Sequence, residues 1–190
     1  MYNSEKLLKD IRSRLSDFRY THSLEVAKSA VYLAEKYGFD TEKAYIAGLA
    51  HDVLKELSKE EYAEFWETCG IVLSPVEKNA PKLWHAIAGA RYLKDEYGFD
   101  EEIITAVRYH TTGRENMSQL EKIIFVADFI SADRSYNGVE DMRERAESSL
   151  EYCMEEGLRF TIEELARENR PIHPETVACY NEILILKGRN

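Results

Sequence analysis

Four of the five histidines stand around an internal near-repeat of the chain. The two copies, residues 32–42 and 92–102, are identical at seven of eleven positions. Each copy has one histidine before it and one after it, in the order His22, His51, His85 and His110. A divalent metal ion needs several imidazole or carboxylate ligands at once. One interpretation is that two helical hairpins each bring two histidines to one place. The other is that the repeat records only two similar helix–glycine–helix corners.

Two aspartates lie in apolar segments, where an ionised carboxylate is unfavourable. Asp52 directly follows His51 in an apolar segment of small residues. Neighbouring helical positions diverge by about 100°, so one metal ion between these two residues can take both side chains. Asp128 interrupts the apolar run 123–130. An ionised carboxylate in such a run costs several kcal/mol unless it is paired or bound to a metal. The alternative to a metal here is an ion pair, for instance with Arg134, and the nearby histidines favour the metal.

The elements that must position these residues are helices. Only 9 Gly and 4 Pro punctuate 190 residues, strand-type alternation is scarce, and an apolar period of 3.6 residues recurs. We therefore predict an all-α helical bundle in which residues 1–190 form one domain. Ser58 and Ser118 each begin a capping-box pattern, and we expect Phe18, Trp84 and Phe125 in the core. The expected helices run from Ser4 to about Phe18, from Thr21 to Tyr37, after Asp40, after Ser58, from Pro81 through Trp84 to Tyr97, from Asp100 to about Tyr109, from Ser118 to Ala132, once or twice between Val139 and Arg167, and after His173.

Composition excludes several classes of protein. The 25 Lys and Arg against 35 Asp and Glu leave a formal net charge of −10, which argues against a nucleic-acid polymer as partner. No apolar run is long enough to span a membrane, and no signal peptide is apparent. The 3 Cys are widely spaced and odd in number, which excludes a disulfide framework and favours the reducing cytoplasm. The apolar tail 183–186 would suit a homodimer.

The ordered set of histidines and aspartates resembles the HD-domain metal-dependent phosphohydrolases. His22, His51-Asp52 and Asp128 follow the H…HD…D pattern, and His85 and His110 match the fuller pattern of members with two metals or extra histidines for substrate. The resemblance covers about residues 16–181 and implies the helical HD fold. Five local stretches are similar to the YqeK-type branch, which resembles symmetrical diadenosine tetraphosphate hydrolases: Arg19-Tyr20-Thr21-His22-Ser23, His51-Asp52-Val53-Leu54-Lys55, His110-Thr111-Thr112-Gly113, residues 128–134, and residues 172–177. One departure is Ser131-Ala132, where many relatives have Glu-Pro.

The resemblance implies hydrolysis of diadenosine tetraphosphate (Ap4A) to two ADP. The implied metal ligands are His22, His51, Asp52 and Asp128. The metal would lower the pKa of bound water and neutralise charge on the phosphoryl group. Iron is favoured, with manganese, cobalt, nickel or zinc as alternatives, because imidazole and carboxylate suit these ions. Asp52 could also orient or deprotonate the water.

Several further side chains are expected to contact the substrate. Lys55 suits a phosphate point charge and a catalytic role, while Arg19 and Arg134 suit bidentate phosphate contacts. Thr111 offers a hydroxyl beside His110. His85 and His110 either bind a second metal or donate to phosphates. His173 either borders the nucleoside or is a plain residue at a helix N-terminus. The substrate-binding set is therefore Arg19, Lys55, His85, His110, Thr111, Arg134 and His173.

Three classes of function stay open at this point. The favoured one is a nucleotide phosphohydrolase, and within it a 5′-nucleotidase or a phosphodiesterase is an alternative to an Ap4A hydrolase. A similar ligand pattern occurs in di-iron HD-domain oxygenases, against which Lys55, Arg19 and Arg134 argue. The third is a binding or regulatory module that has kept its metal.

Overall fold

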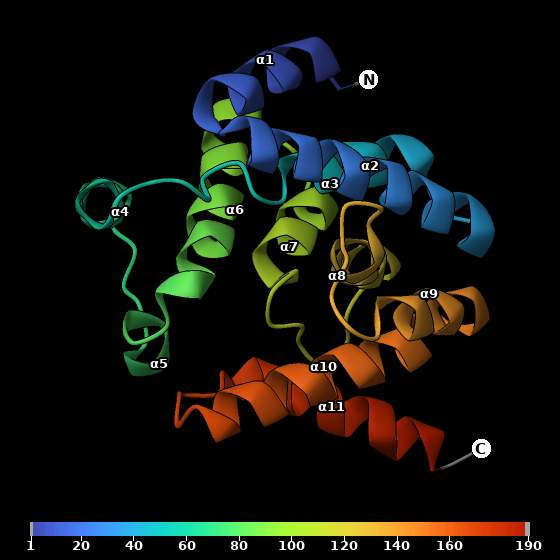
Figure 1. Ribbon diagram of the computed structural model, residues 1–190. Coiled ribbons are helices and arrows are strands. Elements are labelled where there is room, and N and C mark those ends of the chain that lie inside the picture. The colour runs from blue at the N-terminus through green and yellow to red at the C-terminus, as the bar shows by residue number, and fades with distance from the viewer. Residues whose placement is uncertain (1, 189–190) are drawn as a thin grey trace.

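The prediction of an all-α fold is confirmed. The computed structural model describes residues 2–188, and within that range the chain forms helices and loops without a strand. The helices are shown in Figure 1. They are α1 (Ser4–Arg14), α2 (Asp17–Tyr37), α3 (Thr41–Ala50), α4 (Lys59–Cys69), α5 (Pro75–Lys78), a 3-10 turn (Pro81–Leu83), α6 (Trp84–Tyr97), α7 (Glu101–Tyr109), α8 (Gln119–Ile130), α9 (Val139–Ser148), α10 (Leu150–Arg167) and α11 (Pro174–Lys187).

Helix α8 lies at the centre of the arrangement. It packs against α2, α7, α9 and α10, while α2 packs along α3 and α10 packs along α11 (Figure 1). Its apolar residues are buried almost throughout, including Phe125 at 1% exposure. One continuous cluster of buried apolar side chains extends from Leu7 to Ile183. Burial of apolar area is the main favourable contribution to folding. The single-domain organisation stays a prediction.

Helix boundaries follow the polar start signals in the sequence. The side chain of Asp40 accepts hydrogen bonds from two backbone amides at the start of α3. Ser58 and Ser118 form complete capping boxes, as predicted. His173 caps α11, with Pro174 in its first turn. Each cap satisfies backbone groups that have no partner within the helix.

The prediction for the first two helices was wrong in one respect. The chain leaves helical geometry at Leu15, with φ −112° and ψ 142°, and α2 begins at Asp17, earlier than expected. The break is stabilised from far along the chain, because Glu56 accepts hydrogen bonds from both the amide and the hydroxyl of Ser16, at 2.6 and 2.7 Å. Phe18 consequently belongs to α2 and is 69% exposed rather than part of the core.

The remaining differences are smaller. The segment from Val139 to Arg167 forms two helices that meet at Ser149, and the short helix α5 was not foreseen. Trp84 packs against the core but is only partly buried. Across residues 2–188, none of the helices has the length and apolar character that crossing a membrane would require.

Candidate metal centre and active site

The four implied metal ligands meet between α2, α3 and α8. Nε2 of His22 lies 3.0 Å from Oδ1 of Asp128. Nε2 of His51 lies 4.0 Å from the same carboxylate oxygen and 3.6 Å from Oδ2 of Asp52. Both histidines and Asp52 are buried, with exposures of 2% or less. The sequence therefore identified four side chains that the tertiary structure brings together.

A small residue lets two of these helices approach closely. A Cβ added at Gly48 of α3 would lie only 2.8 Å from the Cα of Ala27 in α2. Because no side chain stands there, the end of α3 comes close enough to α2 for the rings of His51 and His22 to lie 5.3 Å apart, centroid to centroid. The glycine thus positions the metal cluster through backbone packing.

His51 presents an unpaired lone pair to the cluster. Nδ1 of His51 lies 2.7 Å from the carbonyl of Gly48, and a carbonyl can only accept. The proton of the neutral ring therefore sits on Nδ1, and Nε2 offers a lone pair. That buried Nε2 has no hydrogen-bond partner. Burial also lowers the pKa of His51 to about 4, so the ring is neutral at pH 7.

His110 is held in the same way and extends the cluster. Its Nδ1 lies 2.7 Å from the carbonyl of Val107, and its Nε2 lies 3.6 Å from Oδ1 of Asp52. Donor atoms of His22, His51 and Asp128 lie within 4.8 Å of one another, as do those of His51, Asp52 and His110. Such a convergence of lone pairs needs a cation, and imidazole with carboxylate suits a divalent transition metal. The residues therefore fit the metal that the sequence pattern implies.

Asp128 contacts both the histidines of the cluster and Arg134, the two kinds of partner that its sequence context suggested. It faces His22, and Arg134 pairs with its carboxylate and also donates from Nε to its backbone carbonyl at 2.8 Å. Burial alone would raise the pKa of Asp128, but the contacts with His22, His51 and Arg134 hold it well below its ordinary value. The carboxylate is therefore ionised at pH 7 and available to a metal.

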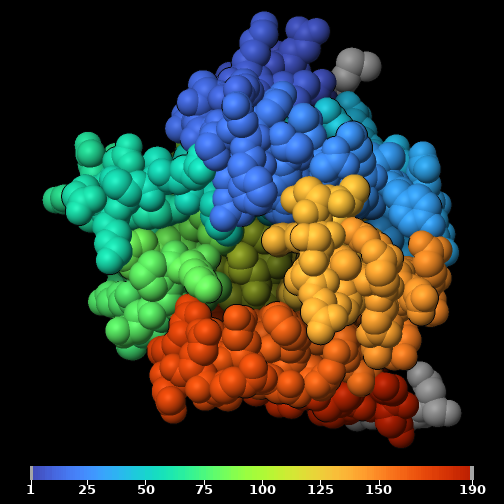
Figure 2. Space-filling model, viewed as in Figure 1, coloured from blue at the N-terminus to red at the C-terminus, as the bar shows by residue number. Residues whose placement is uncertain are grey.

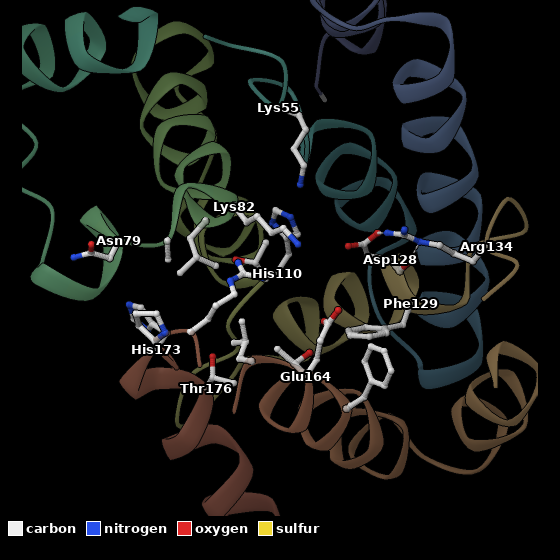
Figure 3. A pocket seen from close by; sticks show the side chains of 18 residues that line it. Lys55, Asn79, Lys82, His110, Asp128, Phe129, Arg134, Glu164, His173 and Thr176 are labelled. Carbon is white, nitrogen blue, oxygen red and sulfur yellow. Dashed lines mark hydrogen bonds and ion pairs between the residues drawn. The ribbon is translucent and has the colours of Figure 1, made fainter. Parts of the chain in front are cut away.

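A cavity of about 360 Å³ opens beside this cluster. Figure 2 shows the corresponding hollow, where the region of α7 and α8 recedes between α6, the loop after α8 and α10. Figure 3 shows Lys55, His110 and Asp128 facing into it. Of the residues predicted to contact substrate, five line the cavity: Lys55, His110, Thr111, Arg134 and His173. The buried hydroxyl of Thr111 has no partner in the protein.

The other two predicted substrate residues, Arg19 and His85, contact Asp52 instead of lining the cavity. Nη1 of Arg19 is 3.7 Å from Oδ2 of Asp52. His85 is 2% exposed, and its Nε2 lies 3.0 Å from Oδ1 of Asp52 and 3.1 Å from Nε2 of His110. Both residues contact the metal cluster, and neither is among the residues that line the cavity.

Sequence reasoning missed several residues of the site. Lys82, Phe160, Glu164 and Arg170 line the cavity from segments that carry no motif, and Phe129 lines it from the segment after Asp128. Asp133 contacts His22, a predicted metal ligand, over a separation of 111 residues. The sequence signal for Phe129 was that it directly follows Asp128. Phe160 and Glu164 come from α10, Arg170 from the segment after it, and Lys82 from the 3-10 turn before α6 (Figure 1).

Comparison with known proteins agrees with this geometry. The HD domain family model matches residues 19–133. The symmetrical bis(5′-nucleosyl)-tetraphosphatase of Bacillus subtilis is 38% identical, over 94% of this chain and 96% of its own. The protein of the same name from Halalkalibacterium halodurans is 39% identical, over 96% and 98%. A crystal structure described as a predicted HD superfamily hydrolase involved in NAD metabolism, from Clostridium acetobutylicum, superposes with a TM-score of 0.92 at 36% identity and covers 100% of both chains. Because the family model spans more than half of the chain and the four predicted metal ligands lie inside it, this protein belongs to the HD domain family.

Proposed function

We propose that this protein hydrolyses Ap4A symmetrically to two ADP, with a divalent transition metal held by His22, His51, Asp52 and Asp128. The observation that carries the proposal is the buried, partnerless Nε2 of His51 in a His–Asp cluster beside a cavity lined by cations. Full-length relatives named symmetrical bis(5′-nucleosyl)-tetraphosphatase support the choice of substrate. When bound, the metal would supply an activated water and neutralise charge on the attacked phosphoryl group.

The cations of the cavity suit a polyphosphate. Lys55 and Arg134 stand nearest the metal ligands, with Lys82 and Arg170 further along the lining. The ammonium of Lys55 provides a compact positive charge, and the planar guanidinium of Arg134 can donate two parallel hydrogen bonds to one phosphate. These cations argue against an oxygenase, which has no phosphate to bind. The partnerless hydroxyl of Thr111 provides a further donor.

The cavity lining also contains apolar and aromatic side chains. Phe129, Phe160 and Leu165 are among them, and aromatic faces suit stacking with a base. His173 also caps α11, so both interpretations of this residue stay open. Asp52, whose carboxylate lies within the cluster, is assigned to orient the attacking water.

Metal number and identity remain predictions. His51, Asp52 and His110 form a second group with donor atoms within 4.8 Å, which would suit a second ion, whereas one ion would leave His110 free to contact a phosphate. We favour iron. Metal analysis of protein purified without oxygen, by mass spectrometry, would give both the identity and the number of ions per chain.

The assay that tests the function is anaerobic incubation of iron-loaded protein with Ap4A, dGTP, GMP, cyclic AMP and ppGpp. Conversion of Ap4A to ADP alone supports the proposal. Formation of ATP and AMP would indicate asymmetric cleavage of Ap4A. Turnover of another nucleotide in place of Ap4A would indicate that this nucleotide is the substrate. Oxygen consumption with a non-phosphate substrate would indicate the oxygenase, and tight nucleotide binding without turnover would indicate the binding module.

Homodimer formation and a cytoplasmic location also remain proposals. Leu184, Ile185 and Leu186 at the end of α11 are 38%, 54% and 52% exposed, and a second copy of the chain could cover them. Cys69, Cys153 and Cys179 are free thiols, which suits a reducing compartment. Sedimentation equilibrium over a concentration series would test the dimer.

A further inference from the structure

The histidines of the metal cluster are not all held by the same kind of group. His51 and His110 each direct Nδ1 to the backbone carbonyl of the residue three positions earlier, at 2.7 Å. His22 differs, because its Nδ1 lies 2.8 Å from Oδ2 of Asp133. A carboxylate therefore stands behind this one imidazole, on the side away from the cluster.

The loop that carries Asp133 is itself firmly placed. Arg143 of α9 donates to three backbone carbonyls around it, those of Ile130, Ser131 and Arg134, at 3.1, 2.9 and 3.2 Å. The next residue, Arg134, pairs with the carboxylate of Asp128. Two consecutive loop residues thus contact two different metal ligands, His22 and Asp128.

The position of Asp133 has a chemical consequence for His22. A histidine that binds a metal through Nε2 must carry its proton on Nδ1, and a carboxylate acceptor at Nδ1 stabilises that tautomer and raises the basicity of the ring. In this structure Nε2 of His22 already faces Asp128, at 3.0 Å. The side chain of Asp133 is 19% exposed and is not among the residues that line the cavity.

We propose that Asp133 is a positioning residue that holds His22 in the tautomer and orientation needed for metal binding. Asp133 directly follows Ser131 and Ala132, which carry no carboxylate. The proposal rests on the metal site of the proposed function, but it concerns metal affinity rather than the substrate. It assigns no contact with the nucleotide to Asp133.

The test compares Asp133→Ala and Asp133→Asn with Asp141→Ala, which removes an exposed carboxylate that pairs with Arg145 in α9. Affinity for Co²⁺ is measured by competition with a chromophoric chelator, and the visible spectrum of the Co²⁺ protein reports ligand geometry. Loss of such an outer partner typically weakens metal binding about 10- to 100-fold. We expect that loss in Asp133→Ala and an altered spectrum. Asp133→Asn should recover part of the affinity because its amide oxygen still accepts, and Asp141→Ala should match the wild type.

A second measurement covers the case in which Asp133→Ala folds poorly. In Zn²⁺-loaded wild-type protein, nitrogen-15 spectra of the imidazoles should show a protected proton on Nδ1 of His22, and Asp133→Asn should keep it. Unchanged Co²⁺ affinity in Asp133→Ala, or a wild-type His22 proton on Nε2, would overturn the proposal. Neither measurement uses a nucleotide, so a protein that binds metal as expected but leaves Ap4A intact would contradict only the proposed function.

Discussion

Nζ of Lys55 lies 2.9 Å from Nε2 of His85. Burial lowers the pKa of His85 to about 4, so its ring is neutral at pH 7. Because an ammonium group can only donate, His85 can accept from it only through the lone pair of Nε2. Lys55 also lies 3.3 Å from Oδ1 of Asp52. Two buried acceptors therefore hold the ammonium at the boundary between the metal cluster and the cavity.

This arrangement predicts that Lys55→Ala impairs turnover while sparing the metal. Removing one group that stabilises transition-state charge costs about 100- to 1,000-fold in kcat. The four proposed metal ligands keep their positions in this variant, so metal content by mass spectrometry should match the wild type. Lys59→Ala, which removes a lysine outside the cavity, is the matched control. Wild-type kcat in Lys55→Ala would contradict the assigned role.

Asp128→Ala should lose both metal and activity. The carboxylate is shared between the cluster and Arg134, so its removal takes away a ligand and leaves a guanidinium beside the remaining histidines. We expect activity to fall by more than about 1,000-fold, beyond the cost of one lost transition-state contact. Full metal occupancy in a folded Asp128→Ala protein, checked by circular dichroism, would refute its assignment as a ligand.

Gly48→Ala should weaken metal binding through packing alone. The added methyl would meet the backbone of Ala27 at 2.8 Å, and overpacking of this kind typically costs about 1–3 kcal/mol. Moving α3 away from α2 would separate His51 from His22. Gly89→Ala in α6 is the control, because its nearest contact is a Val53 methyl at 3.4 Å. Denaturant unfolding and Co²⁺ titration would measure both effects, and equal behaviour of the two variants would contradict this account.

We predict that His173 makes the stability of the fold depend on pH. Its Nδ1 accepts the hydrogen bond from the amide of Glu175 that caps α11, and protonation would remove this acceptor. Burial, opposed by Glu77, lowers the pKa of His173 below its ordinary value. The unfolded chain therefore binds more protons between the two pKa values, so stability rises with pH there and is lost as pH falls from about 6.5.

The comparison for this prediction is His173→Asn, which caps a helix without titrating near neutral pH. A cap contributes about 0.5–2 kcal/mol. The wild type should lose about that much relative to His173→Asn between pH 7.5 and pH 5, measured by urea unfolding of the metal-free proteins. The facing charged groups, Glu77, Arg108 and Glu175, are common to both proteins. If the difference in unfolding free energy between the two proteins does not change with pH, titration of His173 does not cause the pH dependence of stability.

The amino-acid sequence by itself determined the helical class and most helix starts, and it predicted the metal ligands. Helices and caps depend on neighbours within a few residues, so periodicity and residues such as Asp40 and Ser118 suffice to place them. His22, His51, Asp52 and Asp128 could be predicted as ligands because an HD-type pattern keeps ligand types in a fixed order.

Only the tertiary structure decided the contacts between distant segments. The break at Leu15 depends on Glu56, which lies 40 residues from Ser16, and the exposure of Phe18 follows from that break. The contact of Asp133 with His22 spans 111 residues, and Lys82 and Arg170 line one cavity although no local pattern relates them. Local pattern determines which face of a helix is buried, whereas packing between helices determines which polar groups meet. The reason is that such meetings depend on how close the backbones come, as at Gly48.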